Sequence, residues 1–239
     1  MRTLVRANGA GVRFQFDRQR RVVTPAMARL RRAGRTVWGL RGVTLEIGPG
    51  EGVALVGPSG SGKTSLLRLV AGVLTTDEGA LDVEGRVGSL LAVQAGLMTR
   101  LTGRENATLL GVLAGMSPEA TRDSLEAIKE RSGLEDAFER PVSSYSLGMR
   151  ARLGFAVADC RHVDVLALDE VHDALDHEFR EVVAQRAEAI RRRGGIVIAA
   201  GHDHPLLHRL CERAIHLEAG TVADDGPFER VRERYLSAV

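Results

Sequence analysis

The sequence predicts an α/β fold, in which a mainly parallel sheet flanked by helices carries an inserted helical subdomain and antiparallel strands at the N-terminus. Three observations predict it. A short apolar run at 52–56 is followed by the glycine-rich residues 57–64 and by a helical pattern at 65–72. A second apolar run, 163–170, ends in two carboxylates, and residues 104–160 between the two runs are mostly helical in pattern. Strands that alternate with helices along a chain are typical of a parallel sheet.

The glycine-rich stretch reads G-P-S-G-S-G-K-T and fits the pattern G-x-x-x-x-G-K-[ST] at every fixed position. Its glycines allow backbone N–H groups to turn inward onto phosphates, and the following helix points its positive N-terminal end at them. Lys63 is expected to reach the β- and γ-phosphates of a nucleoside triphosphate, and Thr64 to hold Mg²⁺. A chance glycine turn is the alternative, which the flanking strand and helix both disfavour. The candidate nucleotide-binding residues here are Gly57, Ser59, Gly60, Ser61, Gly62, Lys63, Thr64 and Ser65.

The second apolar run supplies the candidate catalytic carboxylates. Asp169 ends this run, where a carboxylate on the Mg²⁺ side of a nucleotide-hydrolysing site is expected. Glu170 follows directly and would orient or deprotonate the attacking water beside the γ-phosphate. The alternative is that both residues merely end a strand at a turn. His202 follows the next apolar run, 195–200, and could reach the γ-phosphate from a neighbouring parallel strand.

Two further histidines and two cysteines are weighed as ligands. His204 and His208 are four residues apart on a predicted helix, a spacing that a metal site can use. No cysteine or carboxylate at ligand spacing joins them, so an ordinary surface helix explains them equally well. Cys160 and Cys211 have no metal or redox spacing, and we expect buried free thiols in a reducing cytosol.

The length of 239 residues allows one large α/β domain or two small ones, and 44% apolar residues suffice for a core. No linker is evident, so we expect a single domain over residues 1–239 with a helical subdomain at about 95–160. No apolar run approaches the roughly 20 residues that span a bilayer, and the N-terminus lacks the apolar region of a signal peptide. We therefore expect a chain that does not cross a membrane alone.

The charges are distributed unevenly along the chain. Residues 1–41 contain eleven arginines, no lysine and one acid, Asp17, which gives a net charge of about +10, and the whole chain carries +2. The remainder is therefore about −8. Such asymmetry favours a basic segment that faces an anionic surface: acidic lipid headgroups, cytoplasmic loops of a membrane protein, or nucleic acid.

The remaining elements follow from local patterns. Residues 3–16 predict one or two edge strands, and the basic insertion at about 17–37 breaks the sheet pattern and carries a short helix after Pro25 or a charged loop. Residues 41–47 alternate as a strand does. The other predicted strands are 79–91 (two, with a turn at 84–85), 213–218 and 221–224, and the other helices run from about 175 to 193 and from about 227 onward. Gly111, Gly115, Pro118 and Gly133 are expected to punctuate the helical subdomain.

These motifs, in this order, resemble the ATPase subunit of ABC transporters. The resemblance rests above all on residues 144–156, S-Y-S-L-G-M-R-A-R-L-G-F-A, which open a helix about twenty residues before Asp169, where that family has its signature motif. In the family two subunits sandwich each nucleotide, one with its phosphate loop and the other with its signature helix. A positive helix N-terminus against a γ-phosphate is physically reasonable. The fold implied is a P-loop NTPase core of the ABC ATPase type.

The details resemble one branch of the family, the ATPases of polysaccharide, O-antigen and teichoic-acid exporters. Residues 101–106 (L-T-G-R-E-N), 169–171 (D-E-V), 176–179 (D-H-E-F) and 210–217 are similar to that branch, as is the basic insertion. The resemblance implies ATP and Mg²⁺ as cofactors, a homodimer, an integral-membrane permease as partner, and a lipid-linked glycan as transported substrate. It places the chain peripherally on the cytoplasmic face of the cell membrane. No nucleic acid and no C-terminal carbohydrate-binding domain are expected.

The resemblance also assigns roles to single residues. Ser146 and Gly148 would contact the nucleotide of the other subunit, and Asp176 would cross the dimer interface. Phe16 would stack on adenine, with Trp38 as the rival. Gln94 would link Mg²⁺ to the helical subdomain, or it is an ordinary loop glutamine. The sequence departs from the family at two positions. Leu147 stands where Ser or Gly is usual, and Gly201 stands where Ser is common. These departures affect the expected hydrolysis rate more than the expected nucleotide binding.

Other functions are compatible with the same fold. A soluble ABC-type ATPase that acts on nucleic acid or ribosomes is permitted by the arginine-rich segment. Against it, such proteins usually carry two tandem nucleotide domains or a long coiled coil. A regulatory subunit with little hydrolysis is suggested by Leu147. An importer subunit is disfavoured by the form of the signature, by resemblance only.

Overall fold

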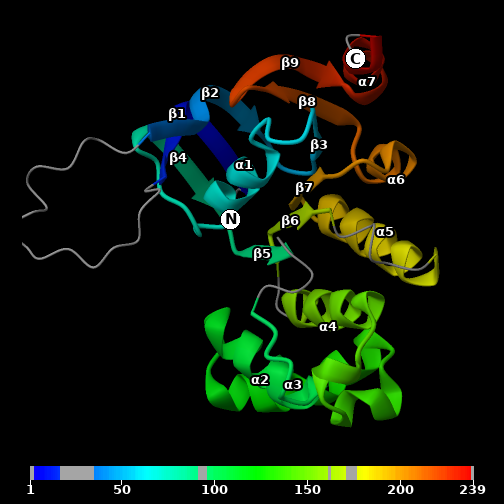
Figure 1. Cartoon of the computed structure of the whole chain (residues 1–239). Coiled ribbons are helices and arrows are strands. Elements are labelled where there is room, and N and C mark those ends of the chain that lie inside the picture. The colour runs from blue at the N-terminus through cyan, green and yellow to red at the C-terminus, as the bar shows by residue number, and fades with distance from the viewer. Residues whose placement is uncertain (1–2, 17–34, 91–95, 161–162, 171–176, 238–239) are drawn as a thin grey trace, which may run out of the picture.

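A computed structural model describes residues 3–16, 35–90, 96–160, 163–170 and 177–237, and the structural statements below concern these residues. They form two sheets with one helix packed between them, and a separate group of helices at one end (Figure 1). The strands are β1 (Leu4–Phe16), β2 (Arg35–Ile47), β3 (Gly52–Val56), β4 (Glu78–Glu84), β5 (Val87–Leu90), β6 (Val165–Asp169), β7 (Ile196–Ala200), β8 (Arg213–Glu218) and β9 (Thr221–Pro227). The helices are α1 (Lys63–Val70), α2 (Gly103–Leu113), α3 (Pro118–Ser132), α4 (Leu147–Asp159), α5 (His177–Arg192), α6 (His204–Leu210) and α7 (Phe228–Ser237).

The larger sheet has the strand order β5-β6-β7-β3-β8-β9. All neighbouring pairs in it are parallel except β8 and β9. Strands β3, β6 and β7 are buried along their whole length. Sheets covered by helices on both faces bury their central strands in this way, which explains the continuous apolar runs in the sequence. Because β3, β6 and β7 run parallel, their carboxyl ends meet at one edge of the sheet, where the candidate site lies.

The smaller sheet is antiparallel, with the order β2-β1-β4. The sequence predicted edge strands for residues 3–16, but β1 is the central strand, because it pairs with β2 on one side and with β4 on the other. The predicted break at 17–37 is also too long. Residues 35–37 already belong to β2 and pair with Phe16, Gln15 and Phe14. Cross-strand pairing decides these boundaries, and a local pattern does not report it.

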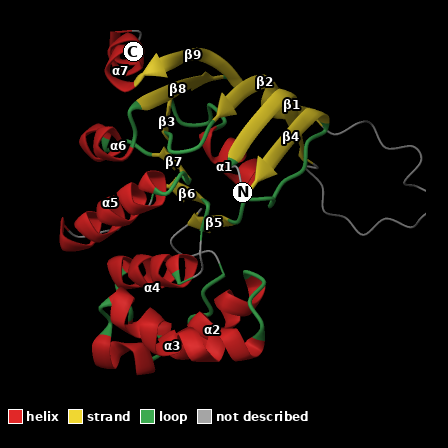
Figure 2. Ribbon diagram, turned by 180° about the vertical axis from the view of Figure 1, so that it is seen from behind, coloured by secondary structure: helices red, strands yellow, loops and turns green. Residues whose placement is uncertain are grey.

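Helix α1 is packed between the two sheets. Its Leu66, Leu67 and Leu69 belong to one core together with apolar residues of β1, β2 and alternate positions of β3, such as Val53 and Leu55. The intervening β3 positions face the opposite core, which α5, α6 and α7 cover (Figure 2). Helix α1 is therefore held from both sides, and so is the loop that joins it to β3. None of the described helices is both long enough and apolar enough to span a membrane.

Helices α2, α3 and α4 lie between β5 and β6 in the chain and form a core of their own around Phe138, Ile128 and Leu153. The helices begin at standard N-cap residues: Thr102 of α2 shares a capping box with Glu105, and Ser117 and Ser146 cap α3 and α4. Gly111, which we expected to interrupt a helix, lies inside α2. Glycine is favoured at this position because a Cβ would come within 2.7 Å of the Thr121 side chain on α3.

The other predicted elements are confirmed, with boundaries shifted by a few residues. The two short strands predicted at 79–91 are β4 and β5, and they belong to different sheets. Both cysteines are free thiols, but only Cys211 is fully buried, and burial raises its pKa to about 12. Cys160 is half-buried, contrary to the expectation of a buried thiol. The predicted helix after Pro25 lies outside the described residues.

Candidate active site

The phosphate-binding loop connects β3 to α1, and its glycines have backbone conformations that other residues rarely adopt. Gly57 has φ 140° and Gly62 has φ 111°. A Cβ at Gly57 would lie 2.2 Å from the carbonyl oxygen of Leu217, and one at Gly62 would lie 2.7 Å from that of Gly39. Both positions therefore require glycine for two reasons, the conformation and the close approach of neighbouring backbone. The predicted strand–loop–helix frame is confirmed.

Lys63 is the first residue of α1, and its side chain turns back into the loop. The residue is 6% exposed, and its ammonium donates hydrogen bonds to the carbonyl oxygens of Gly57 (2.7 Å) and Pro58 (3.0 Å). Burial lowers the pKa of the Lys63 amine below its ordinary value, although the carboxylates of Glu170 and Asp169 oppose this effect. A buried cation inside a loop of inward-turned backbone is suited to binding phosphate oxygens.

Asp169 ends β6 and faces α1. Burial raises the pKa of its carboxyl group above the ordinary value, whereas a hydrogen bond with the Thr64 side chain lowers it. Among the described residues, the buried Oδ1 atom of Asp169 has no hydrogen-bond partner. A buried carboxylate oxygen without a protein donor, beside a hydroxyl group, is a donor set that suits a hard divalent cation. Thr64 and Asp169 therefore fit a Mg²⁺ ion.

Glu170 follows Asp169 in a left-handed conformation, with φ 50°. This conformation is uncommon for a residue with a Cβ and is often retained at functional sites. Its backbone N–H donates to the carbonyl oxygen of Ala200 (2.9 Å), which fixes the turn at the ends of β6 and β7. The Glu170 carboxylate lies 3.8 Å from Nε2 of His202, and both side chains are more than half exposed. The two residues predicted as catalytic thus come together from neighbouring strands.

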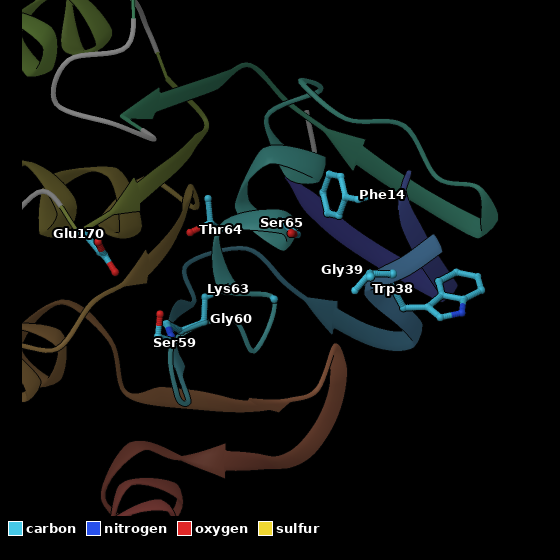
Figure 3. A pocket seen from close by; sticks show the side chains of 11 residues that line it. Phe14, Trp38, Gly39, Ser59, Gly60, Lys63, Thr64, Ser65 and Glu170 are labelled. Carbon is cyan, nitrogen blue, oxygen red and sulfur yellow. The ribbon is translucent and has the colours of Figure 1, made fainter. Parts of the chain in front are cut away.

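The side chains enclose a cleft of about 260 Å³ at this edge of the sheet. Ser59, Gly60, Lys63, Thr64 and Glu170 line one part of it, as Figure 3 shows. Ser61 is not part of the lining: it is 2% exposed, and its backbone N–H and C=O bond to Pro58 and Gly220.

The other part of the cleft is aromatic and is formed by β1 and β2. Phe14 and Trp38 line it, and the Phe14 ring covers Gly39 beside Ser65 (Figure 3). The Trp38 ring lies farther from Lys63 in this view and has the guanidinium groups of Arg13 and Arg41 over it, 5.2 and 5.5 Å from its centroid. Phe14 was not among the predicted site residues. Its place on β1, two residues before Phe16, is the sequence signal for it, but only the three-dimensional structure shows that Phe14 lines the cleft.

The predicted signature residues lie elsewhere. Ser146 caps α4 by accepting a hydrogen bond from the backbone N–H of Met149 (3.2 Å). Leu147 is 48% exposed, and Gly148 is half-buried in the first turn. None of these residues lines the cleft, and both Figures 1 and 2 place α4 below β5 and β6, away from α1. The N-terminus of α4 is thus not brought to the phosphate loop of its own chain.

His204 and His208 have other neighbours. The His208 Nδ1 atom is 3.0 Å from the carboxylate of Glu229, and its ring packs against Phe228. The His204 ring lies near Tyr235, and burial lowers its pKa. Among the described residues, no group of three or more His, Cys, Asp or Glu side chains is arranged to hold a metal ion. These histidines pack α6 against α7.

A search against protein families matches residues 40–173 to the ABC transporter family. The match contains the phosphate loop, the signature residues and both carboxylates, and it covers more than half of the chain. This chain belongs to the ABC transporter family. It is an ATPase subunit of that family, as the resemblance of its motifs predicted.

Relatives of this ABC transporter chain carry two kinds of name. The chain is 35% identical over 206 residues to the O-antigen export system ATP-binding protein RfbB of Klebsiella pneumoniae. The matched region covers 86% of this chain and 84% of RfbB. It is 32% identical over 198 residues to the teichoic acids export ATP-binding protein TagH of Listeria monocytogenes serotype 4b, which covers 83% of the chain and 59% of TagH.

Solved structures show the same fold. A dimeric structure of MJ0796, described as a bacterial ABC transporter cassette, superposes with a TM-score of 0.74 at 23% identity and covers 94% of this chain and 98% of that one. A second structure of the same cassette, described as a dimeric post-hydrolysis state bound to ADP and Pi, has a TM-score of 0.75 at 22% identity. The predicted ABC ATPase fold is therefore confirmed.

The roles of all the predicted site residues stay predictions, and the side chains of three of these residues lie outside the described part of the chain. Gln94 and Asp176 lie outside the described residues, and so does the side chain of Phe16. The backbone of Phe16 pairs with Arg35 at the end of the β1–β2 ladder. The aromatic residues that the structure places in the cleft are Phe14 and Trp38.

Proposed function

We propose that this chain is the ATP-binding and ATP-hydrolysing subunit of an ABC exporter that moves a lipid-linked polysaccharide, such as an O-antigen or teichoic-acid-like glycan, across the cell membrane. The observation that carries the proposal is the similarity to an O-antigen export ATP-binding protein over 86% of this chain and 84% of the relative. The chain would act peripherally on the cytoplasmic face of the membrane, with an integral-membrane permease as its partner.

The phosphate loop would bind ATP through its backbone N–H groups and Lys63. The Lys63 ammonium would exchange its hydrogen bonds with two backbone carbonyls for bonds to the β- and γ-phosphates. Because Lys63 is buried, little water would screen the attraction between its charge and the phosphates. Phe14 is in place to pack against the adenine end of the nucleotide, with Phe16 and Trp38 as the alternatives. Thr64 and Asp169 would hold Mg²⁺, which neutralises charge on the phosphates when bound.

Hydrolysis would be carried out by Glu170 and His202. Glu170 would orient a water molecule and accept its proton while the water oxygen bonds to the γ-phosphorus and the bond to the β–γ bridging oxygen breaks, releasing ADP. His202 would bind the γ-phosphate beside Glu170, since its imidazole lies 3.8 Å from the Glu170 carboxylate. Glu170 lines the cleft, where a γ-phosphate held by Lys63 would project, and His202 lies next to Glu170.

The fully formed site would need a second copy of the chain. The N-terminus of α4, with Ser146 and Gly148, does not line the cleft of its own chain. We propose that it closes over the nucleotide of the partner in an ATP-bound homodimer, where N–H groups of its first turn would meet the γ-phosphate. The dimer would then transmit its motion to the permease through the helical subdomain of α2, α3 and α4.

The experiment that tests this function is affinity purification of the tagged chain from membranes in mild detergent, with identification of the proteins that copurify. A stoichiometric multi-spanning partner is the expected result, and its identity would narrow the glycan. A chain recovered with ribosomes or nucleic acid, and released from them by salt, would instead support a soluble ATPase that binds polyanions through the arginine-rich segment.

A further inference from the structure

The loop that carries His202 is tied to the first turn of α5. The Nη1 atom of Arg180 lies 2.9 Å from Oδ2 of Asp203, the residue directly after His202. The other carboxylate oxygen of Asp203 accepts a hydrogen bond from the backbone N–H of Leu206 (3.0 Å) and so caps α6. One carboxylate therefore connects α5, α6 and the end of β7, at the position next to a candidate catalytic side chain.

The α5 end of this connection is firmly anchored. Phe179, the residue before Arg180, is 4% exposed and packs edge-on against Phe155 of α4, with ring centroids 5.5 Å apart. The guanidinium group of Arg152, also on α4, lies 5.3 Å from the centroid of the Phe179 ring. Arg180 thus starts from a turn that is packed on the signature helix. The same turn therefore contacts both α4 and Asp203.

His202 has reason to depend on such a tie. Its side chain is 56% exposed, so the position of the imidazole depends strongly on the backbone that carries it. That backbone is a short bend between β7 and α6, and the carboxylate of the next residue, Asp203, caps α6. The Arg180–Asp203 pair is itself partly shielded, with side chains 35% and 20% exposed, and a shielded, hydrogen-bonded ion pair restrains its partners more than an exposed one does.

We propose that Arg180 is a positioning residue for ATP hydrolysis. It would hold Asp203, and with it the bend, so that His202 faces Glu170 and the γ-phosphate. Because the same turn of α5 packs on α4, Arg180 would also link the signature helix, which serves the partner's nucleotide, to the histidine that serves its own. This inference rests on the role proposed for His202.

The chain contains a matched control for this tie. Arg209 of α6 and Glu181 of α5 form a two-bonded ion pair, 2.6 and 2.7 Å, between the same two helices. Arg209 is six residues beyond Asp203 and has no part in the N-cap of α6. Removal of Arg209 breaks an α5–α6 ion pair and removes one positive charge, as removal of Arg180 does, but it leaves the His202 bend intact.

The test measures the ATPase activity of the full-length purified variants R180A, D203N, R209A and H202A and of the double variant R180A/H202A, at saturating and limiting Mg-ATP. R180A should lower kcat on the order of 10- to 100-fold with little change in the KM for ATP, because misplacement of a reacting group by about 1 Å costs that much. D203N should act similarly, since Asn still caps the helix but no longer pairs with Arg180 as a charge. The kcat of R209A should remain within about 2-fold of that of the unmodified chain, as expected for the loss of an exposed ion pair.

The double variant separates positioning from general damage. If Arg180 acts through His202, R180A/H202A should be no slower than H202A, whereas a purely structural defect would lower the rate further. A value of kcat for R180A equal to that of R209A, or rates that multiply in the double variant, would overturn the inference. H202A at full rate would refute the role of His202 itself, and H202A slow with R180A at full rate would refute only the tie.

Discussion

The two halves of the proposed nucleotide site in this ABC ATPase differ in how they are built. The phosphate loop lies between β3 and α1, and α1 is enclosed by both sheets, so its glycines and Lys63 are held by the surrounding core. The signature half is the N-terminus of α4, where Ser146 caps the helix and Leu147 is 48% exposed. One half is complete within the chain, and the other presents its groups to the outside.

The two halves are therefore expected to differ in what each can do within a single chain. A buried half that contains its own cation can bind phosphates in a single chain. The first turn of a helix has N–H groups without intrahelical partners, and in the described part of this chain the α4 N-terminus does not reach the cleft. Nucleotide affinity is therefore expected to depend on the phosphate-loop half, and dimerisation and turnover on both. The following variants, from the largest expected effect to the smallest, test this division.

Replacement of Glu170 by Gln should separate binding from hydrolysis. The amide keeps the size of the side chain but cannot accept a proton, so turnover should fall by roughly 10²- to 10⁴-fold while ATP still binds. The ATP-bound dimer should then accumulate, which size-exclusion chromatography with Mg-ATP would detect beside a phosphate-release assay. E119Q, an exposed carboxylate of α3, is the control and should behave as the unmodified chain. An E170Q chain with unchanged turnover would remove Glu170 from the role.

Two helix caps allow the signature half to be tested against its own structural role. Ser146 and Ser117 cap α4 and α3 in the same manner, through backbone N–H groups at 3.2 and 3.1 Å. S146A and S117A should each lower the free energy of unfolding by about 1 kcal/mol. Only S146A should also weaken ATP-dependent dimerisation, by roughly 10-fold, because a hydrogen bond to a charged phosphate is lost as well. Equal dimerisation of the two variants would mean that Ser146 acts only as a cap.

The aromatic part of the cleft can be tested with Phe14 and Trp38. F14L keeps an apolar side chain over Gly39 but loses the ring, so ATP affinity should fall by about 5- to 10-fold, in line with about 1 kcal/mol for stacking on a base. W38L should have a smaller effect, because Arg13 and Arg41 already lie over that ring. Titration with a fluorescent ATP analogue compares the two. A larger loss in W38L would assign the contact to Trp38, and no loss in either would favour Phe16.

The smallest change concerns Leu147. Its exposed side chain stands beside Ser146 in the first turn of α4, where it would crowd the approach of a second subunit. L147S should raise turnover by about 2- to 3-fold with little effect on unfolding, since substitutions of exposed residues away from special features usually change stability by less than about 0.5 kcal/mol. V112S on exposed Val112 of α2 serves as the control. A slower L147S chain would show instead that the apolar side chain contributes to the interface.

Local patterns predicted most of this molecule. The apolar runs of β3, β6 and β7 are continuous because both faces of these strands are buried, and the G-x-x-x-x-G-K-[ST] pattern reports a loop whose conformation only glycine permits at Gly57 and Gly62. Lys63, Thr64, Asp169 and Glu170 could be placed from this frame because each lies at the end of a strand, directly after one, or in the first turn of a helix. The meeting of Glu170 with His202 followed from the rule that parallel strands end at one edge of a sheet.

The family, most of the elements and the candidate phosphate-binding residues were predictable from the sequence, because these depend on periodicity and on short motifs. Only the tertiary structure decided that β1 is a central strand, that Phe14 faces the cleft, and that Arg180 reaches Asp203. Each of these depends on which strands pair, in which register, and on which helix turns pack together. Such contacts join residues far apart in the chain, and no pattern within one segment records them.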